Sequence, residues 1–461
     1  MALDTTPGFD LTPSPKKQAL ASNYITDFNF LNQWLPDTYE KEFERYGNRS
    51  VASFLRMVGA EMPSNSDLIK WAEQGRLHIK YVNCSTDADA FANIATISVN
   101  DAAVTTIGVK TGQTVHISNN AEGTEYNKAI ITDVNYTAGT FNVAYYESGG
   151  QTFTTGASPV LSVFVYGSEF GKGTEGVVQS VEAEDNIFEN SPIIIKEKYA
   201  VSGSDMAQIG WIEVEGDNGP GYLWFLKSEH ETRLRFEDYL ETAMIEAVPA
   251  ETGSGAIGSA KGSEGLFYVV EDRGNVWSGG NPTTLAEFDT IVQRLDKQGA
   301  IDENVLFIDR QFSFDIDDML ASQSSNAAGG VSYGLFDNDE TMALNLGFNG
   351  FRRGYQFYKS DWKYLNDASM RGGIVGGKVN GVLVPAGSTT VYDQVLGKNA
   401  KRPFLHVRYR ASEVEDRKYK TWVTGSAGGA QTSSLDAMEV HFLSERALCT
   451  LGANNFMLFK G

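Results

Sequence analysis

A change of composition between Ala95 and Tyr166 constrains the fold of this chain most strongly. This segment is built from Thr, Val, Ile, Asn and Gly and contains hardly any Lys or Arg. Runs that alternate apolar and polar residues recur in it, and clusters of turn residues separate them. The pattern predicts a small all-β module. Because strand-like sequence both precedes and follows it, we expect an insertion at a hairpin tip, where little backbone hydrogen bonding is lost.

The sequence on either side of this module predicts both helices and strands, which makes the fold class α+β. Ser66 is a possible cap for a short helix that ends at Gly75, and 76–82 alternates as a half-buried strand does. The clearest helix pattern lies within 229–248 and ends at Pro249. One stripe of that helix collects its apolar residues, which are Phe236, Leu240, Ala243, Met244 and Ala247.

From residue 266 onward the pattern alternates between strands and helices. The run LFYVVED (266–272) is expected to be a strand. Thr284 and Glu287 have the spacing of a capping box, so a helix is expected to begin there and to end at Gly299. NVLFID predicts another strand, FSFDIDDMLAS a short helix, and the later segments predict strands up to the C-terminus.

Size, charge and cysteine content exclude several classes of protein. The 461 residues suggest two or three domains, and no stretch reaches the apolar length of a membrane helix. The formal net charge of −21 disfavours specific reading of nucleic-acid bases. The N-terminus lacks the pattern of a signal peptide, so Cys84 and Cys449 are expected to be reduced thiols in an intracellular compartment.

Motifs for enzyme chemistry or metal binding are weak. GSGAIG (253–258) follows a helix pattern instead of a strand, which argues for a linker instead of a dinucleotide site. GGIVGGKV (372–379) has Val379 where a phosphate loop needs a hydroxyl. The carboxylates of 315–318 and 337–340 do not have the spacing of a calcium loop. The five histidines are scattered, so no catalytic, cofactor-binding or metal-binding residue is assigned.

One basic segment and one aromatic group leave alternatives open. Between Lys401 and Lys420 seven basic residues meet three acidic ones, a balance that suits contact with nucleic acid, with an acidic neighbouring copy, or with solvent alone. Tyr145, Tyr146 and Phe153 of the β module are candidate platforms for a sugar. A carbohydrate-binding or hydrolytic protein with an accessory β module is therefore the alternative function.

Four stretches carry a resemblance to a known family. WAEQGRLH (71–78), NVLFIDRQFSFDIDDM (304–319), YKTWVTGSAGG (419–429) and ALCTLGANNFMLF (447–459) resemble the major capsid protein of tailed double-stranded-DNA bacteriophages, which has the Hong Kong 97 fold. More narrowly, these stretches resemble the capsid proteins of crAss-like and related podoviruses. It spans most of the chain, and it is weakest in the 95–166 module.

The resemblance implies a division of the chain into the parts of that fold. It would comprise an N-terminal arm at 1–60, an extended loop and peripheral domain at 61–94 and 167–264 with a spine helix near 229–248, an inserted all-β module at 95–166, an axial domain at 265–430, and a C-terminal return to the peripheral domain at 431–461.

The resemblance also implies a function without catalysis, cofactor or metal. The chain would assemble into hexamers and pentamers of an icosahedral shell that encloses DNA without reading it, assembled in the bacterial cytoplasm and located in the virion. Its partners would be other copies, a separate scaffold, a portal, and cement or head-fibre proteins, with no membrane. The glycine-rich loop after Trp422 would lie near a neighbouring subunit. The residues expected at contacts between subunits are Trp34, Trp71, Arg76, His78, Arg352, Arg353, Arg408, Arg410 and Trp422.

Overall fold

The computed structural model describes most of the chain from Glu61 onward. The described residues are 61–87, 91–102, 104, 106–120, 125–153, 161–176, 185–207, 214–216, 219–221, 224–250, 261–299, 301–325, 350–393, 398–427, 429 and 431–461. The predicted arm at 1–60 and the motifs at 253–258 and 337–340 lie outside them. The chain forms two compact units, and each is described by itself. The first includes Lys196–Asp238 and Lys420–Phe442, and the second includes Val51–Ile195, Tyr239–Tyr419 and Leu443–Gly461.

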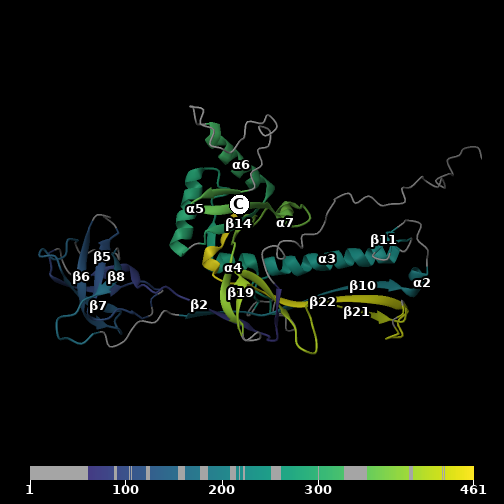
Figure 1. The fold of residues 1–461 in the computed structure, drawn as a ribbon, viewed down its shortest axis with the longest axis horizontal. Helices are drawn as coiled ribbons and strands as arrows, with labels where there is room; N and C mark the ends of the chain where they lie inside the picture. Colours follow the sequence, from purple (N-terminus) through teal and green to yellow (C-terminus); the bar gives the residue numbers. More distant parts are fainter. Residues whose placement is uncertain are drawn as a thin grey trace, which may run out of the picture. The chain divides into compact units, whose positions relative to one another are not determined.

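Six strands of the second unit form a closed antiparallel barrel (Figure 1). The strands are β3 (Lys80–Thr86), β4 (Ile94–Val99), β5 (Gln113–Asn119), β6 (Tyr126–Asn135), β7 (Thr140–Tyr145) and β8 (Leu161–Ser168). They pair in the order β3–β4–β7–β6–β5–β8. Alternate residues point inward and form a core of their own, which includes Ile97, Val115, Ile117, Phe141 and Val163. This alternation is the pattern that marks the segment as β structure in the sequence.

A six-stranded mixed sheet forms the centre of the α/β part of the second unit. Its order is β13 (Asn275–Trp277), β23 (Met457–Lys460), β17 (Val379–Pro385), β14 (Glu303–Ile308), β16 (Tyr355–Asp361) and β15 (Gly350–Arg353). β14 runs parallel to β16 and antiparallel to β17. Neighbouring residues of β14 enter different cores, since Leu306 and Ile308 face one side and Phe307 faces the other. Both faces of this sheet are therefore covered.

Helices cover the two faces of this sheet. α5 (Leu285–Gln298) and α6 (Arg310–Ser325) contribute Phe288, Ile291 and Phe312 to one core. α4 (Leu266–Arg273) and α7 (Lys363–Asn366) contribute to the other. The capping box at the start of α5 is confirmed, because the Thr284 hydroxyl accepts from the Glu287 amide and the Glu287 carboxylate accepts from the Thr284 amide. Gly299 ends α5 with a positive φ of 84°, also as predicted.

Five of the remaining strands form a second sheet, and the others form two-stranded pairs. The sheet contains β1 (Glu61–Ser64), β20 (Leu405–Arg410), β22 (Ala437–Thr450) and β10 (Ile193–Ser202), and β21 (Lys420–Gly425) also pairs with β22. The pairs are β2 (Ile69–Gln74) with β9 (Asp185–Asn190), β11 (Val214–Gly216) with β12 (Gly219–Gly221), and β18 (Ser388–Asp393) with β19 (Lys398–Pro403). Short helical turns lie at α2 (Gly203–Met206), η3 (Arg371–Gly373) and η4 (Ala453–Asn455).

The long helix α3 (Trp224–Glu246) confirms the helix predicted within 229–248, and Phe236, Leu240 and Met244 of its apolar stripe are buried. Among the described helices none is both long enough and apolar enough to cross a membrane.

Three predictions of secondary structure are wrong in whole or in part. The strand expected at 76–82 begins only at Lys80, the first residue of β3, and Leu77 is 71% exposed. The helix expected between Ser66 and Gly75 is the strand β2, whose residues alternate between half-buried and exposed as they pair with β9. The strand expected at 266–272 is the helix α4, in which Leu266, Phe267, Val269 and Val270 are buried. A short run of consecutive apolar residues has no period, so it does not distinguish a buried strand from a buried helix.

Candidate functional site

A connected group of polar and aromatic contacts lies at the end of the two-stranded ribbon β2–β9. Trp71 of β2 lies directly opposite Phe188 of β9, and their ring centroids are 6.3 Å apart. The guanidinium of Arg273, in the last turn of α4, lies 4.3 Å from the Phe188 ring centre and 6.0 Å from that of Trp71. Cation–π attraction and the negative C-terminal end of α4 both favour a cation there.

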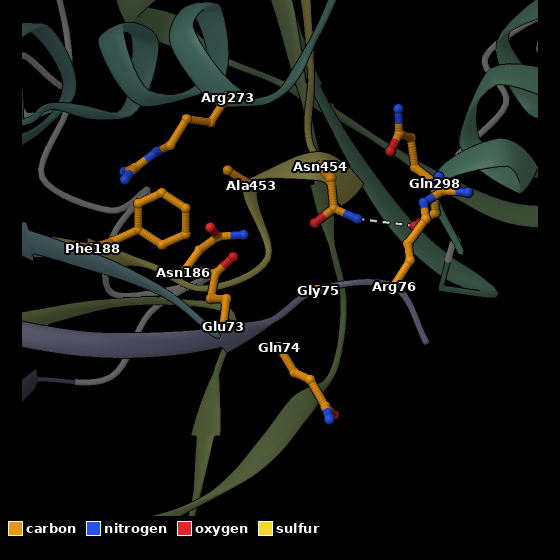
Figure 2. Close-up of a pocket in the computed structure, with 10 residues that line it drawn as sticks. All are labelled: Glu73, Gln74, Gly75, Arg76, Asn186, Phe188, Arg273, Gln298, Ala453 and Asn454. Carbon is orange, nitrogen blue, oxygen red and sulfur yellow. Dashed lines mark hydrogen bonds between the residues drawn. The ribbon is translucent and has the colours of Figure 1, made fainter. Parts of the chain in front are cut away.

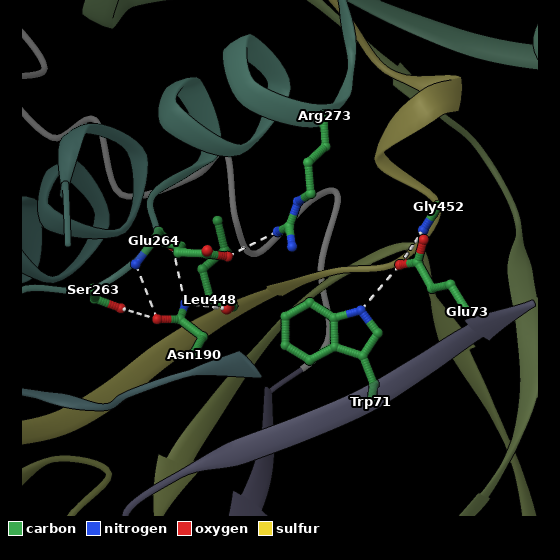
Figure 3. A network of polar contacts seen from close by, with 8 residues as sticks. All are labelled: Trp71, Glu73, Asn190, Ser263, Glu264, Arg273, Leu448 and Gly452. Carbon is green, nitrogen blue, oxygen red and sulfur yellow. Dashed lines mark hydrogen bonds and ion pairs between the residues drawn. The ribbon is translucent and has the colours of Figure 1, made fainter. Parts of the chain in front are cut away.

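Arg273 also forms an ion pair with Glu264, which stands just before α4 (Figure 3). The Arg273 Nη2 and Glu264 Oε2 atoms are 2.8 Å apart. Burial raises the pKa of the Glu264 carboxyl, and Arg273 offsets only part of this rise. The ionised form of Glu264 is therefore less favourable in the folded protein than in water, even beside its partner.

Asn190, the last residue of β9, is buried with every hydrogen-bonding position of its side chain in use. Its Nδ2 group donates to the carbonyls of Leu448, at 2.7 Å, and Glu264, at 3.0 Å. Its Oδ1 atom accepts from the Ser263 hydroxyl and the Glu264 amide, both at 2.9 Å. A side-chain amide has two donors and two acceptor positions, so this one is fully satisfied. It joins the ribbon to the segment before α4 and to β22.

Glu73 fixes the ribbon at a second point. Its Oε1 atom accepts from the indole N–H of Trp71 at 3.0 Å and from the amide of Gly452 at 2.9 Å (Figure 3). Gly452 has a positive φ of 62°, a backbone conformation that glycine adopts without strain. We call this group, made of Trp71, Glu73, Phe188, Asn190, Ser263, Glu264, Arg273 and Gly452, the ribbon root.

A polar pocket of about 310 Å³ adjoins the ribbon root (Figure 2). Two side chains from its lining contact carbonyls in the last turn of α5: Arg76 Nη2 donates to Lys297 O at 2.6 Å, and Asn454 Nδ2 donates to Gln298 O at 2.9 Å. These carbonyls have no partner inside the helix, and a cation beside them is favourable. The pocket lining therefore holds segments together.

Chemically, the ribbon root is suited to holding the chain and not to catalysis. Its two carboxylates, Glu73 and Glu264, are occupied by N–H groups, and its cation Arg273 has an ion-pair partner. Throughout the described residues no three His, Cys, Asp or Glu side chains gather as they would around a metal ion. The arrangement fixes the direction in which the ribbon leaves the α/β part.

The expected contact residues near the ribbon divide among several environments. Trp71 and Arg76 have the partners given above within their own chain. His78 is exposed in the segment between β2 and β3. Trp34 lies outside the described residues. Whether these residues contact another copy stays a prediction.

The expected contact residues of β15 and β20 also have neighbours in the chain. Arg353 forms a two-point ion pair with Asp289, with Nη2–Oδ2 at 2.7 Å, while Arg352 beside it is exposed. Arg410 pairs with Asp67 and lies 3.9 Å from Glu445. Arg408, in the middle of β20, is half-buried.

The basic segment 401–420 is partly neutralised from inside the chain. Besides Arg410, Arg417 pairs with Glu445 at 2.9 Å and Lys418 pairs with Glu61 at 2.5 Å. None of the three alternatives given for this segment included internal pairing. Its local excess of positive charge is therefore smaller on the folded surface than in the sequence.

Trp422 lies in the first unit, on a face formed by β10, β21 and β22. Its ring stacks on that of His441, with centroids 5.0 Å apart. A shallow pocket of about 480 Å³ adjoins the two rings, and Lys196 and Lys198 of β10 also line it. The glycine-rich loop that follows folds back on itself, with the Gly425 amide donating to Thr432 Oγ1 at 2.9 Å.

The remaining candidate residues are acidic residues, cysteines and aromatic residues, and most of them are paired or buried within the chain. Asp317 pairs with Lys359 at 2.6 Å, and Asp315 accepts from Asn281. Both cysteines are buried and neither is in a disulfide bond, and burial raises the pKa of the Cys84 thiol to about 12. The prediction that Phe153 is a platform for a sugar is wrong, because its ring is fully buried in the barrel. Of its two companions, Tyr145 is half-buried and Tyr146 is exposed.

Sequence reasoning missed most of the ribbon root. Asn190 and Arg273 carry no local motif, and Glu73 resembles any exposed acidic residue. Their partners lie far away along the chain, up to 258 residues for Asn190 and Leu448. Because 266–272 was predicted to be a strand, the sequence did not indicate that Arg273 is the last residue of a helix.

Comparisons with known proteins give little at the level of sequence. No protein-family model matches the chain, and no curated protein matches it.

Solved structures resemble it at low similarity. A chain of Gordonia phage Cozz has a TM-score of 0.42 at 9% identity, covering 98% of this chain and 97% of its own. The mature capsid of bacteriophage PhiM1 gives 0.39 at 8%, covering 92% and 91%. The capsid of a native GTA particle gives 0.40 at 9%, covering 92% and 95%. TM-scores below 0.5 establish neither the fold nor the function of this chain.

Proposed function

We propose that this chain is the major capsid protein of a tailed bacteriophage with a Hong Kong 97-like fold. Copies assemble into hexamers and pentamers of an icosahedral shell that encloses double-stranded DNA. Two things support the proposal. One is the resemblance of four sequence stretches to such proteins. More narrowly, these stretches resemble the capsid proteins of crAss-like and related podoviruses. The other is the geometry of the ribbon β2–β9.

The ribbon is the observation that carries the proposal. Within the described residues β2 and β9 pair only with each other, so both outer edges of the ribbon carry unpaired backbone groups. An isolated two-stranded ribbon is marginally stable in water, and open edges invite pairing with another chain. The protein nevertheless fixes this ribbon by the buried Asn190 and the stacked Arg273. A firmly anchored ribbon with open edges suits contact between copies.

One face of the ribbon is open and carries one large apolar side chain, Ile187, beside the Lys70–Glu189 ion pair. Trp71 and Phe188 face Arg273, whereas Ile187 points away from them and is 68% exposed, with Ala72 opposite it on β2. In this proposal Ile187 is a point at which a second copy contacts the ribbon, beside its open strand edge. Arms and loops that reach across neighbours bury the large areas typical of obligate assemblies.

The division into parts follows the family pattern in this proposal. The barrel, whose strands run from 80 to 168, contains the module expected at 95–166 within the extended loop, and α3 is the spine helix. Five strands of the six-stranded sheet lie within the axial domain at 265–430, whereas β23 lies in the segment 431–461 that the family pattern assigns to the peripheral domain. The nine expected contact residues, Trp34, Trp71, Arg76, His78, Arg352, Arg353, Arg408, Arg410 and Trp422, are proposed to lie at or near the contacts between copies.

The remaining features of the proposal concern charge and partners. The net charge of −21 suits a shell that holds DNA without binding it tightly. Scaffold, portal, and cement or head-fibre proteins are the other partners, and the protein has no cofactor and no catalytic role. Assembly takes place in the host cytoplasm, and the product is the virion capsid.

The sedimentation of purified full-length protein tests this proposal. Wild-type protein is expected to sediment as rings or shells of many copies. Ile187→Glu places a charge at the open face of the ribbon, and this variant is expected to shift to small species. Because Ile187 is exposed in the single chain, the substitution changes the stability of the fold by about 0.5 kcal/mol or less.

Ile94→Glu is the matched control. Ile94 lies on β4 of the barrel, away from the ribbon in sequence, and it is 65% exposed. This variant is expected to assemble as the wild type does. A wild-type protein that stays monomeric at high concentration would refute the proposal. An Ile187→Glu variant that assembles normally would remove the ribbon as its basis.

A further inference from the structure

The hairpin that joins β20 to β21 presents an apolar side chain among acidic ones. Val414, near its tip, is 96% exposed, and Glu413, Glu415 and Asp416 beside it are exposed too. A single exposed valine is common on protein surfaces. Val414 differs from such a residue in the fixed shape of the turn that carries it and in the sign of the charge around it. We call residues 411–416 the acidic tip.

Hydrogen bonds within the turn hold the acidic tip in one shape. The Ser412 amide donates to the Glu415 carbonyl at 2.8 Å. The Ser412 hydroxyl accepts from the amides of Val414 and Glu415, at 3.3 and 3.2 Å. Ala411 and Asp416 form the bridge that closes the turn. A turn fixed in this way loses little conformational freedom when it binds, which lowers the entropic cost of a contact.

The base of the hairpin is neutralised by carboxylates from elsewhere in the chain, whereas the tip stays acidic. Arg410, Arg417 and Lys418 have the ion pairs given above. Among the described residues no cation pairs with Glu413. A segment that is basic in the sequence therefore ends in a point of negative charge on the folded surface.

A positively charged face of the first unit carries the opposite sign. It is the open face of three neighbouring strands, β10, β22 and β21. Alternate positions of these strands supply its side chains, which include Lys196, Lys198, Lys420, Trp422, Glu439 and His441. Three lysines and one glutamate give these residues a net charge of +2, in a chain whose total is −21. We call this group the lysine face.

The pocket of about 480 Å³ in the lysine face is lined by three rings and by lysine side chains. The Trp422 and His441 rings stack with their centroids 5.0 Å apart. Thr424 Oγ1 lies 2.8 Å from His441 Nε2, a contact that fixes the imidazole. Phe442 is the third ring. Rings and lysine stems together offer apolar surface that a small aliphatic side chain can cover.

One ammonium group of this pocket is left for a partner. Lys198 pairs with Glu439, and Glu197 pairs with Arg235, each at 2.8 Å. No described carboxylate pairs with Lys196, which is exposed. Within the described part of the chain, the pocket therefore has an unpaired positive charge beside its rings, and the acidic tip has an unpaired negative charge beside its valine.

A second exposed valine lacks this complementarity. Val375 is 92% exposed, and its loop, 371–378, contains Arg371 and Lys378 and no acidic residue. A pocket that contains lysines repels a loop of this charge and attracts the acidic tip. Of these two valines, Val414 is the one whose neighbours suit the pocket.

We propose that the acidic tip of one copy binds in the pocket of the lysine face of a second copy, with Val414 against the rings and Glu413 beside the Lys196 ammonium. The contact joins two different surfaces and is therefore heterologous, the kind of contact that closes into rings when the rotation permits. It rests on the proposed function, and it deepens that function by naming one pair of surfaces through which copies meet.

Sedimentation of the full-length protein at a series of concentrations tests this contact. Val414→Ser is expected to raise the concentration at which copies associate about tenfold, as for the loss of one buried aliphatic side chain. Val375→Ser is the matched control and is expected to associate as the wild type does. Both valines are exposed in the single chain, so neither substitution should disturb the fold, which circular dichroism checks.

A charge exchange identifies the partner of the pocket. Lys196→Glu and Glu413→Lys are each expected to weaken association about fivefold, because each replaces an attraction by a repulsion. A 1:1 mixture of the two variants is expected to recover association, since each variant supplies the charge that the other lacks. Lys172→Glu makes the same change of charge at another exposed lysine and is expected to have no effect.

Several results would overturn the inference and leave the proposed function in place. Unchanged association of Val414→Ser, equal weakening by Val375→Ser, or a mixture as weak as its two components would each do so. Recovery in the double variant Lys196→Glu/Glu413→Lys, but not in the mixture, would place the contact within one chain.

Two further outcomes identify other failures. If a DNA duplex bound the protein, Lys196→Glu abolished that binding and Glu413→Lys associated normally, the lysine face would bind nucleic acid and the inference would fail. A wild-type protein that does not associate at any concentration would refute the proposed function, and this contact with it.

Discussion

The barrel and the ribbon root obtain their stability from different parts of the chain. Every buried residue of the barrel core lies between Tyr81 and Val163. The ribbon root instead joins β2, β9, the start of α4 and β22, and its Asn190–Leu448 hydrogen bond spans 258 residues. A core made of contacts within one segment can form without the rest of the chain, whereas distant contacts require most of the chain to be in place. We therefore expect the barrel to be able to unfold by itself, and the ribbon root to depend on the completed fold.

The largest expected effect on the free energy of unfolding comes from substitutions that create a cavity in one core at a time. Phe141 fills the barrel core and Phe307 fills a core of the six-stranded sheet, and both are fully buried. Phe→Ala at either site is expected to cost about 3–5 kcal/mol of unfolding free energy. Hydrogen exchange measured by mass spectrometry should show faster exchange in β3–β8 for Phe141→Ala and faster exchange in β14, β17 and β23 for Phe307→Ala.

The comparison fails if the two variants have the same exchange pattern. Equal loss of protection in both regions would mean that the barrel and the α/β part unfold as one cooperative unit.

A somewhat smaller effect is expected at Asn190. Asn190→Ala leaves the Leu448 carbonyl, the Ser263 hydroxyl and the Glu264 amide without the partners that the side chain supplied. A buried polar group without a partner costs about 1–3 kcal/mol, so we expect a total loss of about 3 kcal/mol in a urea titration. Exchange protection of the barrel should not change.

Asn186 provides the matched control for this substitution. It lies on the same strand but is exposed, so Asn186→Ala is expected to be nearly neutral. Similar losses in the two variants would show that the buried amide does not anchor the ribbon.

The smallest effect is a dependence on pH at Glu264. Because burial raises the folded pKa of this carboxyl above its usual 4.5, its contribution to stability is present below that value and is lost as pH rises through the folded pKa. Glu264→Gln removes this ionisation. Its stability relative to the wild type is therefore expected to improve from about pH 4 to about pH 7. Urea titrations at both pH values measure the change, and a worsening would mean that the pair with Arg273 outweighs the burial.

The same contrast explains which parts of the fold could be predicted from the sequence. The barrel strands follow from the alternation of apolar and polar residues, and α5 follows from Thr284, Glu287 and Gly299, because these signals lie within a few residues of one another. The helix α4 could not be distinguished from a strand, since Leu266–Val270 is an unbroken apolar run. β2 was mistaken for a helix because its partner β9 is more than a hundred residues away.

The sites differ in predictability for the same reason. Trp71 and Arg76 lie in one of the four stretches that carry the resemblance, which is why the sequence predicts them as contact residues. Arg76 lines the pocket beside the ribbon root, and Trp71 belongs to the ribbon root itself. Asn190, Glu264 and Arg273 were not selected, because only the folded chain brings them together. The three residues predicted to be platforms for a sugar, Tyr145, Tyr146 and Phe153, differ in exposure for a similar reason, because the direction in which each ring points depends on strand register.

Electron microscopy of the purified full-length chain tests the central claim most directly. If copies of this chain join through an anchored ribbon, images should show rings with five or six copies or closed shells, and Ile187→Glu should abolish them. A uniform population of single molecules, at concentrations where the wild-type protein is folded, would contradict the account.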